Sequence, residues 1–277
     1  MSWLLAVFLG LVQGVAEFLP ISSSGHLALF QSLFGLEEAP VFFDVLLHFG
    51  TLLSLCVFYW RDIADMAGEL VRGVRDLAPS RRRHTGRVPK ARRLVLLLIV
   101  ACLPLFPAVF FSDTVEFLLQ KPMFIGLFLC LTGAVLFVSD RLRPGTRKDE
   151  TNATVGDALL VGVCQGVAIL PGLSRSGMTI SGGLLRRFDR AFAVRFSFLL
   201  SLPAVLGATL LQLFKELRQG FDTTHLPVYL LGMAVAAVSG YFAIGLVKRL
   251  VVSGKFGGFA YYCLAVGAIA IVLSFLL

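Results

Sequence analysis

The chain has 277 residues, of which 57% are hydrophobic and only 15% charged, and its formal net charge is +8. Soluble domains carry about 25% charged residues, so this composition excludes an ordinary soluble protein and predicts an integral membrane protein. Polar breaks separate its apolar stretches, whereas a membrane barrel would show alternation in ~10-residue segments, so we expect an all-α protein. Excess Lys and Arg in a membrane protein marks cytoplasmic loops, and we therefore predict no nucleic-acid partner.

The apolar segments follow a regular order along the chain. Residues 1–19 and 25–34 form a pair that is interrupted at Pro20, and the second member is too short to span a bilayer. This pair predicts a re-entrant helical hairpin. Three longer segments follow it: 41–60, 94–111 and 124–138 with its flanks.

The same order then recurs in the second half of the chain. Its short pair covers residues 155–169 and 177–185, and its longer segments cover residues 193–214, 228–246 and 259–277. We therefore predict six membrane spans and two re-entrant hairpins. The stretch 61–93 is hydrophilic and basic, which predicts a solvated cytoplasmic loop, with binding of lipid headgroups as the alternative.

A polar motif interrupts each short pair. The first, QGVAEFLPISSSGH, runs from Gln13 to His26, and a related stretch, QGVAILPGLSRSG, runs from Gln165 to Gly177. Seven of thirteen aligned positions are identical at a constant offset of 165 − 13 = 152 residues. Broken helices with polar side chains at membrane depth are tolerated where they line an enclosed cavity. We expect both motifs to face one cavity.

Each copy of the repeat contains three spans, an odd number, so the second copy must enter the membrane upside down. The sequence thus predicts one membrane domain over residues 1–277, built from an inverted-topology repeat with copies at about 1–140 and 153–277. Placing the basic residues 61–93 in the cytoplasm puts both termini on the periplasmic or extracellular side. The two polar hairpin tips then meet near the bilayer centre.

The second motif predicts an anion site. Ser174 and Ser176 offer hydroxyls, Arg175 offers a permanent planar cation, and Gly177 allows the backbone to approach a ligand closely. A short helix begins there, and a helix N-terminus together with Arg suits phosphate. The alternative is that Arg175 forms a structural ion pair with Glu17.

The first motif supplies groups that a simple phosphate receptor does not need. Glu17 is a candidate metal ligand or proton carrier, Ser23 a candidate nucleophile, and His26 a candidate acid or base close to it in sequence. On the segment 41–60, Asp44 and His48 are four residues apart and share one helix face. We expect them to support the site from behind, with an interhelical hydrogen bond as the alternative.

Three stretches carry a resemblance to a known family. The motif from Gln13 to His26 and the stretch PGLSRSGMT from Pro171 to Thr179 resemble the two signature motifs of bacterial undecaprenyl-pyrophosphate phosphatases, also known through bacitracin resistance. The stretch FDVLLHFGT, from Phe43 to Thr51, is similar to a further block of that family. The resemblance covers essentially the whole chain, although many relatives have Glu at the position of Gln13.

This resemblance implies a multi-pass enzyme of the bacterial inner (plasma) membrane. It would hydrolyse undecaprenyl pyrophosphate to undecaprenyl phosphate and inorganic phosphate with a divalent cation, Mg²⁺ or Ca²⁺, recycling the lipid carrier for peptidoglycan synthesis and conferring bacitracin resistance. Ser23, or water in its place, would attack the terminal phosphorus while His26 relays a proton. The expected partners are the polyprenyl pyrophosphate lipid, bilayer lipids and a second copy of the chain in a homodimer.

The expected site residues fall into three groups. The catalytic residues are Glu17, which also binds the metal, Ser23, His26 and Arg175. The pyrophosphate is bound by Ser22, Ser24, Ser174, Arg175, Ser176, Gly177 and Thr179. The supporting residues are Gln13, Asp44, His48 and Thr51. The main alternative function is a transporter or flippase of a polyprenyl-phosphate lipid, because inverted repeats with broken helices are a common transporter plan.

Overall fold

The computed structural model describes residues 1–35, 41–76, 89–107, 110, 112–119, 121–142, 147–219 and 225–275. The regular secondary structure of these residues is helical. The β pairing among them is a single isolated bridge between Lys148 and Phe188. The prediction of an all-α protein is therefore confirmed. The middle of the basic stretch, residues 77–88, lies outside the described residues.

Four helices of the described chain are long and apolar enough to cross a membrane. They are α3 (Val41–Phe58), α7 (Pro122–Arg141), α10 (Arg190–Gln219) and α11 (Leu226–Val252), in order along the chain. Each corresponds to a span predicted from the sequence. The chain is therefore that of a membrane protein.

The other two predicted spans are shorter than expected. Helix α5 (Lys90–Cys102) has 13 residues, and α12 (Gly258–Leu273) has 16, which at 1.5 Å per residue gives a length of about 24 Å. Helix α5 gives way to a 3₁₀ turn, η1 (Leu103–Leu105), because Pro104 cannot donate the backbone hydrogen bond that would continue it. The expectation of six full-length spans is not confirmed.

Two helices lie where the sequence predicted connectors. Helix α4 (Trp60–Asp76) occupies the first half of the expected solvated loop, and α6 (Ser112–Leu119) lies between the apolar segments expected at 94–111 and 124–138. Ile63 and Met66, one helical turn apart, pack against the main hydrophobic core. Charged residues flank these apolar positions, so the helical spacing was not recognised in the sequence. The prediction of a loop over residues 61–76 was therefore wrong.

Pairs of short helices lie where the sequence predicted the two hairpins. Helices α1 (Trp3–Phe18) and α2 (Ser23–Leu33) form the first pair, and α8 (Val155–Val167) and α9 (Arg175–Leu185) form the second. Helices α1 and α8 begin 152 residues apart (155 − 3), and so do α2 and α9 (175 − 23). The ends of α2 and α9 are also 152 residues apart (185 − 33). The internal repeat is thus seen in these helix boundaries as well as in the sequence.

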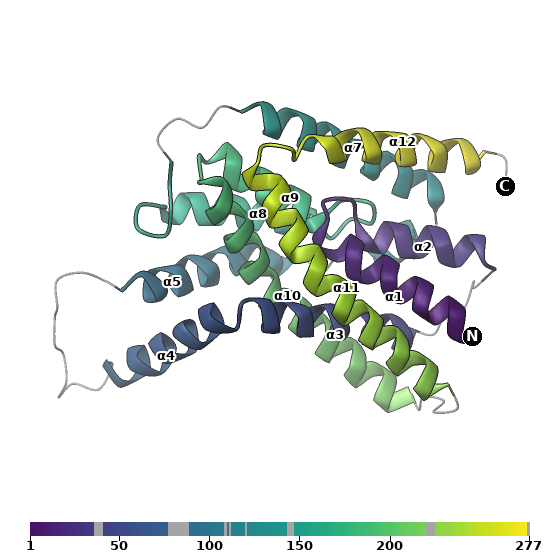
Figure 1. Ribbon diagram of the computed structural model, residues 1–277, viewed down its shortest axis with the longest axis horizontal. Coiled ribbons are helices and arrows are strands. Elements are labelled where there is room, and N and C mark those ends of the chain that lie inside the picture. Colours follow the sequence, from purple (N-terminus) through teal and green to yellow (C-terminus); the bar gives the residue numbers. More distant parts are fainter. Residues whose placement is uncertain are drawn as a thin grey trace.

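Close packing through glycine joins helices from the two halves. Helix α11 lies against α1 and α3, and α12 lies beside α7 (Figure 1). A Cβ atom on Gly10 of α1 would lie 2.5 Å from the carbonyl oxygen of Gly232 on α11, and one on Gly126 of α7 would lie 2.7 Å from that of Gly267 on α12. These backbones approach so closely that only glycine fits.

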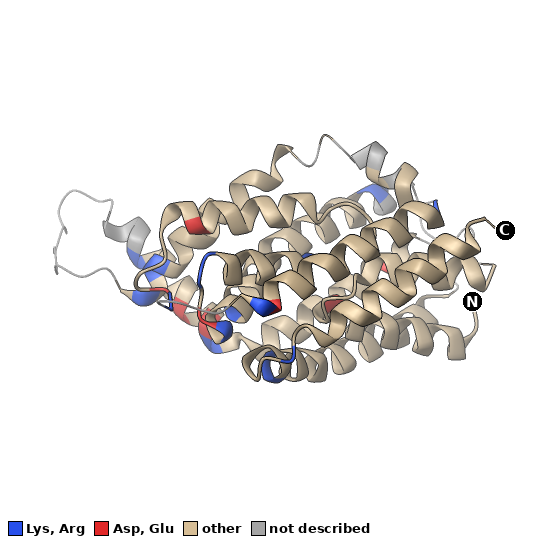
Figure 2. Cartoon of the chain, turned by 90° about the horizontal axis from the view of Figure 1, so that it is seen from above, with Lys and Arg blue, Asp and Glu red and all other residues tan. Residues whose placement is uncertain are grey.

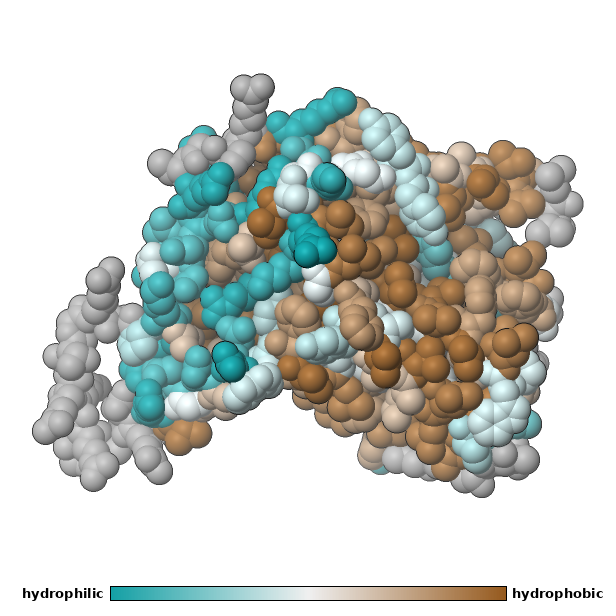
Figure 3. All heavy atoms as spheres, in the orientation of Figure 1, coloured by the Kyte–Doolittle hydropathy of each residue, from teal (hydrophilic) through white to brown (hydrophobic). Residues whose placement is uncertain are grey.

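Charged and apolar surfaces occupy different parts of the molecule. The Lys and Arg residues lie mainly along the end of the molecule from which α4 and α5 project (Figure 1 and Figure 2), and hydrophobic residues cover the part formed by α1, α3 and α11 (Figure 3). Ion pairs stabilise the charged end, including Arg195 with Asp62 and Lys148 with Asp157 at 2.8 Å. The start of α1 and the end of α12 both lie at the opposite end (Figure 1).

Candidate active site

The breaks of the two hairpins meet in one cavity of about 380 Å³. The first break contributes Ser22, Ser23 and Ser24 to its wall, and the second contributes Ser174 and Arg175. Small and apolar side chains of α10 complete the wall, among them Ala204, Val205 and Ala208. The expectation that both motifs face one cavity is confirmed, because the N-termini of α2 and α9 open into it.

Glu17 is the most heavily bonded group in this cavity. Its side chain is 6% exposed, near the end of α1. One oxygen, Oε1, contacts Nη2 of Arg175, and the other, Oε2, accepts hydrogen bonds from Ser23 Oγ at 2.6 Å and Gln13 Nε2 at 3.0 Å. Nδ1 of His48 lies 3.7 Å from the same oxygen. A carboxylate with these donors is held in one orientation.

Arg175 makes the ion pair with Glu17 that the sequence offered as the structural alternative. The pair does not use the whole guanidinium, because its second terminal nitrogen, Nη1, is buried and has no hydrogen-bond partner. A buried donor without a partner is costly, and an anion in the cavity would satisfy it. The contact therefore leaves the predicted anion-binding role intact.

The remaining hydroxyls of the second motif mainly hold its loop in place. Ser174 Oγ accepts a hydrogen bond from the N–H of Gly177 at 3.1 Å, and Ser176 Oγ donates to the carbonyl of Leu19 at 3.1 Å. Thr179 Oγ1 lies 2.5 Å from Ser197 Oγ on α10. Unlike Ser174, the residues Ser176, Gly177 and Thr179 do not contribute to the cavity wall.

His26 does not touch the predicted nucleophile. Its Nδ1 lies 2.9 Å from the carbonyl oxygen of Ser22, and its Nε2 lies 2.8 Å from the hydroxyl of Tyr262 on α12. Glu17 is the group that accepts the hydrogen bond of Ser23 instead. Proximity in sequence suggested His26 as an acid or base for Ser23, but the imidazole turns back towards the preceding loop, so the structure does not show a direct contact between the two side chains.

The supporting residues divide between the cavity and its surroundings. His48 lines the cavity, and Gln13 Nε2 lies 2.9 Å from its Nδ1. Thr51 donates to the carbonyl of His48 at 2.8 Å, so it supports that turn of α3. Asp44 accepts from Gln31 on α2 at 2.9 Å, which is the interhelical hydrogen bond offered as the alternative.

The side chains of the cavity would bind a hard divalent cation only if the bound substrate supplied further oxygen ligands. No group of three or more His, Cys, Asp or Glu side chains lies together in the described part of the chain. Glu17 is nevertheless accompanied by an unpartnered buried oxygen, Oε1 of Gln13, whose side chain is fully buried. Mg²⁺ commonly takes one or two carboxylates and completes its shell with substrate phosphates and water. One carboxylate and one free amide oxygen fit that arrangement.

Comparison with known proteins places this chain in a family. The model of the bacitracin resistance protein BacA family matches residues 6–269. The chain belongs to the BacA family. Relatives named undecaprenyl-diphosphatase include one from Methanosphaera stadtmanae, 40% identical over 98% of both chains, and one from Halothermothrix orenii, 39% identical over 97% of this chain and 96% of that protein. A third, from Pelobacter propionicus, is 40% identical over 96% of this chain and 95% of its own.

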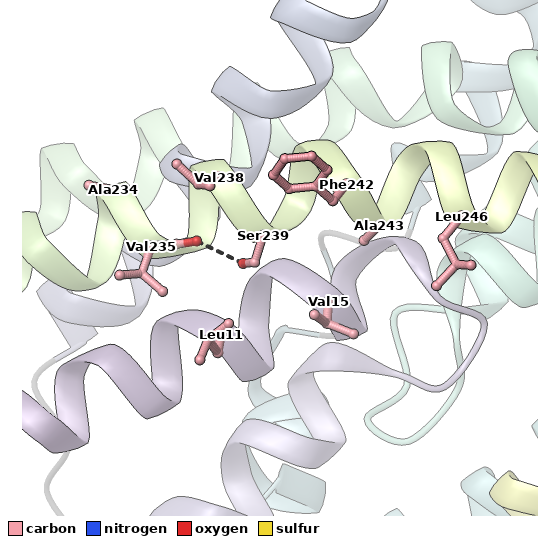
Figure 4. A pocket seen from close by; sticks show the side chains of 9 residues that line it. All are labelled: Leu11, Val15, Ala234, Val235, Val238, Ser239, Phe242, Ala243 and Leu246. Carbon is pink, nitrogen blue, oxygen red and sulfur yellow. Dashed lines mark hydrogen bonds between the residues drawn. The ribbon is translucent and has the colours of Figure 1, made fainter.

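This BacA-family chain also has a larger hollow that holds none of the predicted site residues. It is a groove of about 670 Å³ between α1 and α11 (Figure 4). Its wall is apolar except for Ser239, whose hydroxyl donates to the carbonyl of Val235 in its own helix at 2.7 Å. Without a charged side chain this groove cannot bind pyrophosphate, so we place the chemistry in the smaller cavity.

Sequence reasoning missed several residues that shape the site. Thr132 of α7 accepts from the N–H of Ser174 and donates to the carbonyl of Gly172, each at 3.1 Å, so it fixes the second loop. Tyr262 and Ser197 contact the motifs from α12 and α10. A lone hydroxyl in an apolar helix was the available signal, but it does not reveal its partner.

Proposed function

We propose that this BacA-family chain is an undecaprenyl-diphosphatase. It hydrolyses undecaprenyl pyrophosphate to undecaprenyl phosphate and inorganic phosphate, recycles the lipid carrier for peptidoglycan synthesis and confers bacitracin resistance. Relatives of that name at about 40% identity over nearly the whole chain support this activity. The structural observation that carries it is the cluster of Arg175, Glu17 and Ser23 in a cavity shared by both motifs.

The proposed binding mode uses residues that line the cavity. The unpartnered Nη1 of Arg175 and the hydroxyls of Ser22, Ser24 and Ser174 bind the pyrophosphate, aided by the N-termini of α2 and α9. Ser176 and Thr179 hold the second loop in position. The apolar side chains of α10 receive the first part of the prenyl chain, which suits a lipid substrate.

The proposed reaction begins at Ser23. Its Oγ gives its proton to Glu17, to which it is already hydrogen-bonded, and attacks the terminal phosphorus. The bond from that phosphorus to the bridging oxygen breaks, and undecaprenyl phosphate leaves with the bonding electron pair and takes the proton from Glu17. Water then cleaves the phosphoserine and releases inorganic phosphate. Arg175 stabilises the negative charge on the phosphoryl oxygens throughout.

A divalent cation completes the proposed site. Glu17 and Oε1 of Gln13 would hold it together with pyrophosphate oxygens, and when bound it would neutralise phosphate charge. Mg²⁺ or Ca²⁺ both suit oxygen ligands. The amide of Gln13 makes this a site with a single protein carboxylate.

We further propose an inverted repeat in the bacterial inner membrane, with copies at about 1–140 and 153–277 and with α1–α2 and α8–α9 as re-entrant hairpins. The constant offset between these helix pairs and their meeting in one cavity support it. Basic residues at one end, and the start of α1 and the end of α12 at the other, support a cytoplasmic placement of α4 and outer termini (Figure 1 and Figure 2). The homodimer remains a prediction.

The experiment that tests this function is phosphate release from undecaprenyl pyrophosphate by the purified protein in detergent. The wild type is compared with Glu17→Ala, Arg175→Ala and the control Ser239→Ala, which changes the apolar groove only. Cation-dependent release by the wild type and the control, lost in the two site variants, is the expected result. A folded wild type that binds the lipid without releasing phosphate would overturn the proposal and favour a lipid transporter.

A further inference from the structure

A chain of contacts joins α12 to the loop that carries Ser23. The hydroxyl of Tyr262 lies 2.8 Å from Nε2 of His26, and Nδ1 of the same ring lies 2.9 Å from the carbonyl oxygen of Ser22. The two rings are also stacked, with centroids 5.6 Å apart and an angle of 11° between their planes. Ser22 immediately precedes the proposed nucleophile.

The direction of each hydrogen bond follows from the groups involved. A carbonyl oxygen can only accept, so Nδ1 of His26 must carry the hydrogen that it donates to Ser22. In a neutral imidazole Nε2 is then the acceptor, and the hydroxyl of Tyr262 is its donor. The Ser22 carbonyl thus sets the tautomer, and the hydroxyl of Tyr262 donates to the free Nε2 and holds the ring in that orientation.

Ser22 needs such a hold because its backbone is strained. Its φ of 68° and ψ of 95° lie where residues other than glycine are uncommon. The resulting carbonyl accepts both the backbone N–H and the ring Nδ1–H of His26. The side chain of His26 thus adds a second bond to the one that any residue at this position would make.

The second half of the molecule provides an internal comparison. Ser174 is the repeat counterpart of Ser22 and has an ordinary φ of −77° and ψ of 116°. The counterpart of His26 is Met178, which makes only the backbone bond to the Ser174 carbonyl. The strained conformation therefore occurs in the loop whose histidine contacts Tyr262, and it is absent from the loop that has Met178 in place of that histidine.

We infer that Tyr262 is a positioning residue for the reaction. By donating to His26 it fixes the ring that holds Ser22, and so it keeps Ser23 within reach of Glu17. It touches neither the cavity nor the reacting atoms. This inference rests on the proposed function and deepens it, because it assigns a role to a side chain 236 residues away from His26 in sequence.

The first test compares Tyr262→Phe, His26→Gln and the double variant in phosphate release. Tyr262→Phe keeps the ring but removes one hydrogen bond, so we expect kcat to fall about 3- to 10-fold with KM unchanged. Because Tyr262 acts through His26, the double variant should be no slower than His26→Gln alone. Tyr261→Phe, the matched control on the same helix, should match the wild type.

Additive losses in the double variant, or an unchanged kcat in Tyr262→Phe, would overturn the inference. A second measurement does not depend on activity and uses ¹⁵N spectra of histidine-labelled protein. The chain has four histidines, and the signal that disappears in His26→Gln is that of His26. We expect an Nδ1–H tautomer with a hydrogen-bonded Nε2 at His26 in the wild type, and loss of the hydrogen-bond shift at Nε2 in Tyr262→Phe. If that signature is found but the wild type releases no phosphate, the proposed function fails while the contact stands. If the signature is missing, the inference fails.

Discussion

The guanidinium of Arg175, at the start of α9, contacts the carboxylate of Glu17, near the end of α1, although the two residues are 158 positions apart in the chain. The contact joins the two copies of the repeat at their polar breaks. In the proposed reaction it places the base, Glu17, beside Ser23 and the cation, Arg175, beside the bound pyrophosphate. The proposed reaction depends on both copies for this reason.

Glu17→Gln tests the carboxylate as proton acceptor and metal ligand. An amide keeps the shape but neither the charge nor the basicity, so we expect phosphate release to fall by about 10²- to 10⁴-fold. The variant leaves the mostly buried Arg175 without its counter-charge, so its melting temperature in detergent should also fall.

A double variant separates the two effects. Adding Arg175→Gln to Glu17→Gln removes the unpaired charge, so the melting temperature should recover while phosphate release stays lost. Recovery of activity together with stability would show that the pair is structural, and the proposed mechanism would be wrong.

Gln13 should affect the concentration of divalent cation that phosphate release requires. If its unpartnered Oε1 binds the ion, Gln13→Leu will raise the cation concentration needed for half-maximal phosphate release, and Gln13→Glu will lower it. A chelator should abolish release by the wild type, and added Mg²⁺ should restore it. Titration of Mg²⁺ against chelator-treated protein measures these values; identical cation dependence in all three proteins would remove Gln13 from the metal site.

The repeat made much of the site predictable from the sequence. The offset of 152 residues allowed the positions of both helix breaks to be predicted. The identical residues in the two motifs implied that Ser23 and Arg175 line one cavity, and the structure shows that they do. Pairing across the fold could not be foreseen in the same way. The partner of His26 is Tyr262, and that contact depends on how α12 packs against the rest of the molecule.

Helix lengths were less predictable, for local reasons. Pro104 stops α5 early, although the apolar composition continues through residue 111 and suggested a full span. In α4 the charged residues suggested a loop, but Glu69 is buried and bonded to Arg92 at 3.1 Å. Composition alone does not tell a charged loop from a helix whose charges are paired.

The two capping serines should respond differently to glycine. Ser22→Gly relieves a positive φ at the cost of a weak cap, so we expect an unchanged or higher melting temperature, whereas Ser22→Ala should lower it. Ser174 has no such strain, so Ser174→Gly should be destabilising. Thermal melting of the three purified variants measures this; equal effects at Ser22 and Ser174 would argue against strain in the first loop.

Asp157 should be the most sensitive acidic residue outside the cavity. Its side chain is fully buried and accepts from Lys148 at 2.8 Å and Arg186 at 2.6 Å, and it completes a capping box with Thr154 at the start of α8. We expect Asp157→Ala to destabilise the protein by about 2–4 kcal/mol, because it removes the cap and leaves two cations without their counter-charge.

The matched control for Asp157 is Asp65→Ala, at an exposed position on α4, which should change stability by less than about 0.5 kcal/mol. Melting temperatures of both variants in the same detergent compare the two sites. Since α8 leads directly into the second break, loosening its start should also reduce phosphate release by displacing Arg175. Destabilisation by Asp157→Ala with full activity at a temperature where the variant is folded would show that the second loop is held by its own contacts, chiefly those of Thr132 with Ser174 and Gly172.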